Sequence, residues 1–203
     1  ADNSRVDVDA ASQITVTFSK KTRLIHLNHG QAYFQVEKNK ARPFIVEANG
    51  RRVIATGTAF DVETLGKGVR VTLTEGHVTV RSASDPSTVI AKLQPGDQLI
   101  DEGDAPPRII RLANILKATS WRQGKLMFDD EPLPYVLAEM NRYSLIKVRA
   151  GDAPTAALRV SGVFNAGDVS ALIAALKDYY PINAVAGASN QVSLVHSQPP
   201  SRP

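Results

Sequence analysis

The stretch "RRVIATGTAFDVETLG", residues 51–66, alternates like a β-strand but carries a glycine near its middle. Glycine weakens a strand interior and usually marks a bulge or a close approach of another backbone. Ile54, Phe60 and Val62 share one face of the expected strand. We therefore predict a strand kinked at Gly57, which turns Phe60 and Val62 into the core beside Phe34 and Phe44. Gly57 has a structural role in this prediction and cradles no ligand.

The same period-two alternation continues through residues 4–110. Turn signals separate the short strand patterns at Asn28–Gly30, Glu75–Gly76 and Pro95–Gly96, and the second of these is typical of a hairpin. No segment of helical length and period interrupts them. Residues 1–112 are therefore predicted to form an all-β domain, an antiparallel sandwich or coil of short strands.

The pattern changes after the proline pair Pro106–Pro107. The segment "PLPYVLAEMNRYS" has the i, i+3, i+4, i+7 apolar spacing of an amphipathic helix, and Asp129 and Asp130 are candidate N-caps for it. Asp168 is the expected cap of a second helix. The predicted order is β-α-β-β-α-β-β, so residues 113–203 form a small α+β module with a loose tail from about residue 197. The fold class is mainly β followed by α+β.

Bulk composition excludes several function classes. The 24 basic and 20 acidic side chains give a formal charge of +4, spread evenly along the sequence, which disfavours nucleic-acid binding. The absence of cysteine excludes disulfides and thiolate metal sites. The longest apolar run, residues 171–176, is too short to span a bilayer, where ~20 residues are needed. The start "ADNSRVDVD" has neither a methionine nor a signal-peptide pattern, and we interpret the sequence as part of a longer protein.

No catalytic, cofactor or metal constellation is recognisable. His26 and His29 lie beside a turn, where two imidazoles would not converge on one metal as they do at helical i, i+4 spacing. The acidic clusters 101–104 and 129–131 lack the ligand spacing of a calcium loop. We therefore expect no enzyme activity, no metal and no cofactor, and a role in binding or interaction. Trp121 and four of the five tyrosines lie in the second half, as core or interface residues.

Three linked motifs stand out in the first half: G-x-A-x-F-x-V at residues 30–36, R-P-F-x-V at residues 42–46 and G-T-x-F-x-V at residues 57–62. Together they resemble the FecR family of membrane-anchored sigma-factor regulators. The later segments "VTLTEGHVTV" and "LQPGDQL" are similar to the turns that follow in that family. The region from Trp121 to Ser144, followed by "RVSGVF", resembles the STN module that many such regulators carry at their C-terminus.

The resemblance implies a periplasmic signal-relay region of a single-pass inner-membrane protein of a Gram-negative bacterium. Its implied partner is the N-terminal signalling domain of a TonB-dependent siderophore receptor, and the signal controls an extracytoplasmic-function sigma factor that acts in iron uptake. The sigma-binding segment of the family pattern lies outside this sequence, and no direct membrane insertion of this region is implied. Two alternatives stay open: an STN-type assembly module of a secretin-like envelope complex, and a carbohydrate-binding or hydrolytic β-protein.

Partner binding is expected in the α+β module, for two reasons. Most large aromatic residues lie there, and small α+β modules pair through sheet edges or helix faces. The candidate partner-binding residues are Tyr135, Glu139 and Arg142 on the first helix and Leu158, Val160 and Phe164 on an expected edge strand. The expected structural residues are Phe34, Phe44, Gly57, Phe60 and Trp121.

Overall fold

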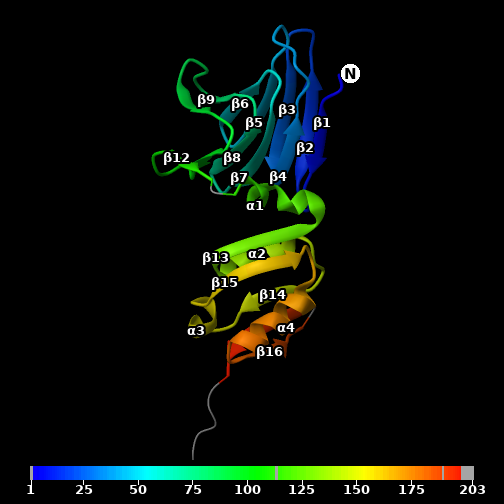
Figure 1. Ribbon diagram of the computed structural model, residues 1–203, viewed down its shortest axis with the longest axis vertical. Coiled ribbons are helices and arrows are strands. Elements are labelled where there is room, and N and C mark those ends of the chain that lie inside the picture. The colour runs from blue at the N-terminus through cyan, green and yellow to red at the C-terminus, as the bar shows by residue number, and fades with distance from the viewer. Residues whose placement is uncertain (1, 113, 189, 198–203) are drawn as a thin grey trace, which may run out of the picture. The chain divides into compact units, whose positions relative to one another are not determined.

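The computed structural model describes residues 2–112, 114–188 and 190–197. The chain divides into two compact units, Ala1–Thr119 and Ser120–Pro203, and each unit has its own hydrophobic core (Figure 1). The boundary expected at residue 112 precedes helix α1 (Ile115–Thr119), which belongs to the first unit. No helix among the described residues is long and apolar enough to cross a membrane.

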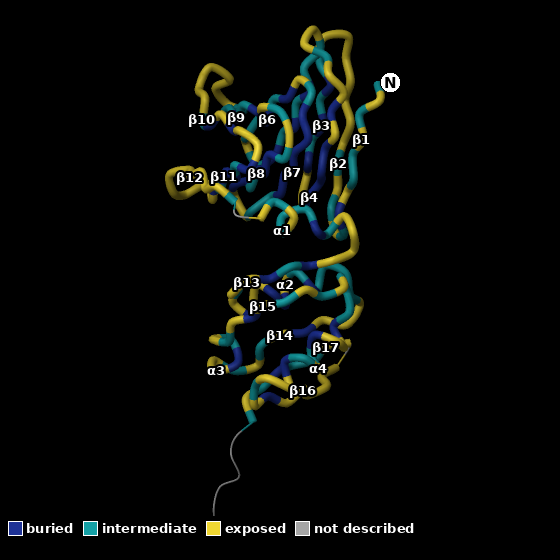
Figure 2. The backbone as a smooth tube through the Cα atoms, in the orientation of Figure 1, coloured by how far each residue is buried: buried dark blue, intermediate teal, exposed yellow. Residues whose placement is uncertain are grey.

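Two six-stranded sheets build the first unit. The first sheet has the order β1-β4-β7-β8-β11-β12, with the strands Arg5–Val8, Gln31–Gln35, Ala59–Leu65, Gly68–Glu75, Asp97–Asp101 and Arg108–Arg111. The second has the order β10-β9-β6-β5-β3-β2, with the strands Val89–Leu93, Val78–Ser82, Arg51–Ala55, Phe44–Ala48, Arg23–His29 and Gln13–Phe18. Neighbouring strands are antiparallel except β3 and β5, which are parallel. Apolar side chains from both sheets form one core, and Figure 2 shows the inner strands buried and β12 exposed.

The chain passes repeatedly from one sheet to the other. Four of these passages contain a glycine with positive φ: Gly30 after β3, Gly57 after β6, Gly76 after β8 and Gly96 after β10. The hairpin expected at Glu75–Gly76 is therefore wrong, because β8 and β9 lie in different sheets. The chain does turn at Gly76, as predicted, but the two strands on either side of the turn pair with other strands and not with each other.

Gly57 lies between two strands and not inside one. β6 ends at Ala55 and β7 begins at Ala59 in the opposite sheet, so the single kinked strand predicted from the sequence is a passage between sheets. The φ of Gly57 is 137°, and a Cβ there would lie 2.9 Å from the Cβ of Lys38. A residue with a side chain at this position would have to adopt a backbone conformation that favours glycine. Its Cβ would also clash with the neighbouring chain segment at Lys38.

We expect Gly57→Val to lower the free energy of unfolding of the first unit by about 3 kcal/mol, at the upper end of the range for backbone strain. Gly50→Val is the matched control, since Gly50 also has positive φ (72°) but nothing lies within 4 Å of its added Cβ. That control should lose about 1–2 kcal/mol. Urea titration compares the two variants, and equal losses would show that the approach of Lys38 contributes nothing.

The described part of the second unit contains two small sheets, three α-helices and one 3₁₀-helix. The elements are the 3₁₀-helix η1 (Ser120–Gln123), β13 (Lys125–Pro132), α2 (Leu133–Arg142), β14 (Lys147–Ala150), α3 (Ala153–Ala156), β15 (Arg159–Asn165), α4 (Val169–Tyr179), β16 (Ile182–Ala186) and β17 (Gln191–His196). β13 pairs with β15, and the other sheet has the order β14-β17-β16. The predicted class, mainly β followed by α+β, is confirmed, but the pattern missed the short helical segments α1, η1 and α3.

Local sequence explains the two longer helices. α2 buries Leu133, Val136, Leu137 and Met140, which recur at helical spacing. The Asp168 carboxylate accepts a hydrogen bond from the Ala171 N–H at 3.0 Å and caps α4 as expected.

The capping role predicted for Asp129 and Asp130 is wrong. Both residues belong to β13, and Pro132 occupies the N-cap position of α2 without a side-chain hydrogen bond. The strand has a bulge between Phe128 and Glu131, where Asp130 has a φ of 51°. The bulge accommodates Asp129 and Asp130 within the strand. Trp121, in η1, packs against the core of the second unit.

Candidate functional site

The strand β16 offers an uncharged sheet edge. It pairs with β17 on one side, and no described strand pairs with its other side. Its residues from Asn183 to Ala186 are all exposed, and Val185 has 51% of its surface accessible. Tyr179, at the end of the preceding helix, is 83% exposed. An open strand edge with apolar and aromatic side chains beside it is a template for strand addition by another chain.

The strand β15 pairs with β13 alone among the described strands, so it is a second open edge. It holds two of the six predicted binding residues, and a third, Leu158, directly precedes it. Val160 is buried in the core of the second unit, and Leu158 and Phe164 are half-buried against that core. Val163 is the large apolar side chain that this strand exposes, with 59% of its surface accessible, beside the exposed polar residues Arg159, Ser161 and Asn165. The backbone edge of β15 and the outward position of Val163 are therefore the accessible parts of the predicted strand site.

Ion pairing marks the start of the same strand. Arg159 Nε lies 2.8 Å from Asp130 Oδ1, and the hydrogen bond with this carboxylate raises the pKa of the Arg159 guanidinium. Both side chains are largely exposed, so solvent screens the pair. The pair places one positive and one negative side chain beside the accessible edge of β15.

The helix-face candidates lie together on α2. Arg142 Nη1 lies 3.1 Å from Glu139 Oε2, at i, i+3 spacing, and both side chains are mostly covered. Tyr135 is partly exposed one turn earlier. All three side chains take part in further interactions within the chain, so the structure brings these candidates together as an engaged cluster.

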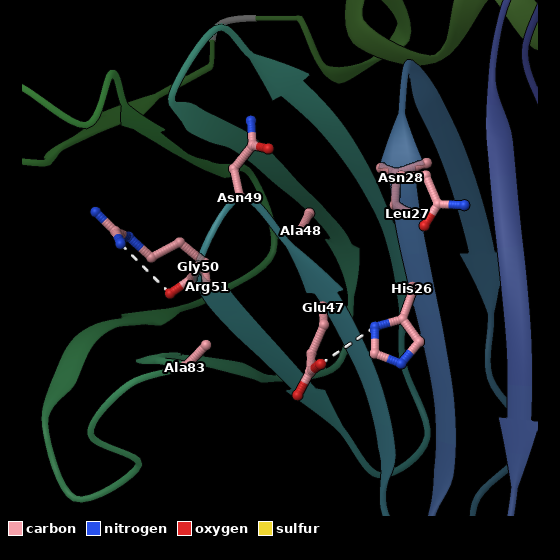
Figure 3. Close-up of a pocket in the computed structure, with 9 residues that line it drawn as sticks. All are labelled: His26, Leu27, Asn28, Glu47, Ala48, Asn49, Gly50, Arg51 and Ala83. Carbon is pink, nitrogen blue, oxygen red and sulfur yellow. Dashed lines mark hydrogen bonds and ion pairs between the residues drawn. The ribbon is translucent and has the colours of Figure 1, made fainter.

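The first unit also contains a shallow depression. It has a volume of about 280 Å³ and lies where β5 turns into β6 beside the end of β3. Figure 3 shows His26 and Glu47 facing each other across the paired strands, with His26 Nδ1 3.2 Å from Glu47 Oε2. Arg52 Nε also binds Glu47, at 2.5 Å, so this carboxylate already has two partners. Because the Glu47 carboxylate is already bound by two side chains and the depression is shallow, the depression offers little to a ligand.

No set of three or more His, Asp or Glu side chains among the described residues is arranged to hold a metal ion. His26 and His29 lie three residues apart on β3, where successive side chains alternate between the faces of the sheet. No sequence pattern singles out the depression near His26, because its walls come from segments that are far apart along the chain, at residues 26–28, 47–51 and 83.

Comparison with known proteins adds a family and a fold. Residues 1–79 match the family described as FecR protein. No curated protein matches the chain. Two crystal structures of a candidate anti-sigma factor from Parabacteroides distasonis ATCC 8503, at 1.65 and 2.50 Å, have TM-scores of 0.78 and 0.77. Both are 21% identical in sequence, and the similarity covers 97% of this chain and 92% of theirs.

At this level of identity the two structures establish a shared fold that includes both units. The family match is independent of them and falls on the strands whose motifs resemble FecR regulators, including Phe34, Phe44 and the passage at Gly57. Residues 1–79 are therefore similar to the FecR family, and the two solved structures add a shared fold for the whole chain.

Proposed function

We propose that this chain is the signal-relay part of a membrane-anchored regulator of an extracytoplasmic-function sigma factor. The observation that carries the proposal is the FecR match over residues 1–79. The fold shared with a candidate anti-sigma factor across 97% of the chain supports it for both units. The role is regulatory and non-catalytic.

The proposed partner is the N-terminal signalling domain of a TonB-dependent siderophore receptor, met in the periplasm. The second unit serves as an STN-like module that receives this domain, and the first unit links it to the anchor. The sigma factor is reached only through a cytoplasmic segment outside this sequence. The receptor signal thereby controls transcription of iron-uptake genes.

The contact is proposed to form at the open strand edges of the second unit. Backbone groups on the outer sides of β15 and β16 supply hydrogen bonds, and exposed side chains such as Val163 and Val185 supply selectivity. The α2 cluster of Tyr135, Glu139 and Arg142 is the neighbouring helix-face candidate. A specific yet releasable complex of this kind buries about 1,200–2,000 Å² in total.

We expect a fragment of residues 120–203 to bind the cognate signalling domain within about tenfold of the affinity of the full chain. A fragment of residues 1–119 should show no binding. Each fragment contains a complete core of its own, so both should fold. Isothermal titration calorimetry against a panel of receptor signalling domains measures the two affinities. Binding by residues 1–119, or by neither fragment, would contradict this placement of the interface.

Matched charge substitutions then separate the two edges. Val163→Lys and Val185→Lys change exposed side chains on β15 and β16, and Val89→Lys makes the same change on an exposed site of the first unit. The variant on the edge that meets the partner should lose at least about tenfold in affinity, because a desolvated ammonium replaces an apolar contact. The Val89 control should bind normally. Loss of binding in the control would point to a non-specific effect of charge.

A further inference from the structure

The fold brings together two loops at one end of the first unit. Residues 19–22 connect β2 to β3, and residues 37–43 lead from β4 to β5. The Arg42 guanidinium joins the loops, since its Nε donates a hydrogen bond to the Ser19 carbonyl at 2.9 Å. The two segments lie about twenty residues apart in sequence, so a search for runs of consecutive basic residues does not find the charge of the combined surface.

The joined loops carry lysines without counter-charges. Lys20, Lys21, Lys38 and Lys40 are all exposed. None of the four forms an ion pair with a carboxylate in the described part of the chain. Glu37 is the only acidic residue within the described segments 19–22 and 37–43.

The nearby carboxylate of Asp2 does not neutralise these lysines. It is bound to the guanidinium of Arg23, which is completely buried. Asp2 and Arg23 therefore neutralise each other, and within the two described loops Glu37 is the one carboxylate that opposes the four lysines and Arg42.

The opposite end of the same unit is arranged differently. Strand pairing from β4 through β7 and β8 to β11 places Asp101 at the far end from the two loops. There the cations have carboxylate partners: Arg51 with Asp101, Lys67 with Asp104 and Arg108 with Glu102. These ion pairs contrast with the four lysines of the two loops, which have no carboxylate partner in the described part of the chain.

Apolar surface accompanies the lysines. Phe18 precedes the first loop and is 40% exposed, and the Arg42 guanidinium lies over its ring at 5.6 Å from the centroid. Val16, two residues earlier on the same face of β2, is also exposed. Flexible lysines around an exposed aromatic ring match a layer of anionic headgroups above hydrocarbon, because the long stems and the ring reach the apolar boundary while the ammonium groups stay among phosphates.

We propose that the surface formed by Lys20, Lys21, Lys38, Lys40 and Phe18 docks on an anionic phospholipid bilayer. This proposal goes beyond the receptor contact proposed above and uses the other unit of the chain. Docking would fix one end of the β unit against a membrane surface.

Co-sedimentation with vesicles tests the proposal on the full chain. The chain should bind vesicles of mixed phosphatidylglycerol and phosphatidylcholine and should not bind pure phosphatidylcholine vesicles. Each lysine removed should lower the partition coefficient about fivefold, so Lys20→Gln with Lys21→Gln should lose about 25-fold, as should Lys38→Gln with Lys40→Gln. Lys67→Gln with Lys92→Gln removes the same charge from exposed sites elsewhere in the unit and should lose little.

Further arms identify the ligand. Raised salt should weaken binding, because screening shortens the reach of the lysine charges, and soluble glycerol phosphate should compete poorly if a lipid surface is required. Equal losses in the loop and control variants would overturn the proposal, as would a chain that binds duplex DNA but no vesicle at the same salt concentration. Binding to vesicles by a chain that binds no receptor signalling domain would support this inference and leave the proposed function as the failing part.

Discussion

The Phe60→Ala variant is expected to lose about 3–5 kcal/mol of the unfolding free energy of the first unit. Phe60 is completely buried, and its ring stacks on that of Phe34 with centroids 5.2 Å apart. Phe34 in turn meets Phe44 at 5.8 Å, so the substitution opens a cavity at one end of an aromatic row that joins the two sheets. Urea titration followed by circular dichroism measures the loss.

The matched control is Phe18→Ala, which removes the same atoms from a ring that is 40% exposed. It should cost about 1 kcal/mol, since less apolar area returns to water and solvent fills the space. Similar losses in the two variants would mean that the Phe34–Phe60 contact is not a central part of the core.

Replacing Arg23 by alanine is expected to cost about 3 kcal/mol. Its side chain is completely buried, and its guanidinium donates to the Arg42 carbonyl at 2.9 Å and the Glu37 carbonyl at 3.1 Å. It also binds Asp2 and lies over the Phe44 ring at 5.4 Å. The variant therefore leaves a cavity and several acceptors without their donor.

Two further variants separate packing from charge. Arg23→Met keeps much of the buried stem and should recover part of the loss, whereas Arg5→Ala removes a largely exposed cation and should stay within about 0.5 kcal/mol of the parent. An Arg23→Ala chain that unfolds at the same urea concentration as the Arg5→Ala chain would contradict the central role of this side chain.

The pH dependence of the same contact follows from Asp2. Burial raises the pKa of its carboxyl, but hydrogen bonds from Arg23 and Ser4 outweigh burial, and the pKa lies below its usual value of 3.8. The contribution of the pair is therefore complete above about pH 4 and is lost as the pH falls through the folded-state pKa. The difference between parent and Arg23→Ala should shrink in acid.

The sequence predicted where strands are but not which strands are neighbours. Gly30, Gly76 and Gly96 were recognised as turn residues, and each lies in a turn with positive φ. The same backbone conformation serves a hairpin and a passage to the opposite sheet. The choice between them depends on pairing with strands far along the chain, such as β4 with β1, which no local pattern contains.

The candidate site shows the same limit in a different form. Alternation along residues 158–164 correctly separates two faces of the strand, but the apolar set around Val160 packs inward, as apolar sets usually do. The accessible member, Val163, belongs to the other set. The four lysines of the first unit were visible as residues, yet their assembly into one surface depends on the contact between Arg42 and Ser19.

The alternation of the chain between the two sheets has a consequence for cooperativity. Consecutive segments of the first unit enter opposite sheets, from β3 to β4, from β6 to β7, from β8 to β9 and from β10 to β11. Hairpins of consecutive strands occur within each sheet, such as β5–β6 and β7–β8, but neither sheet can be completed while the other is missing its strands. Amide protons in β4 and β5, although they lie in different sheets, should therefore exchange through the same global opening, with one shared free energy.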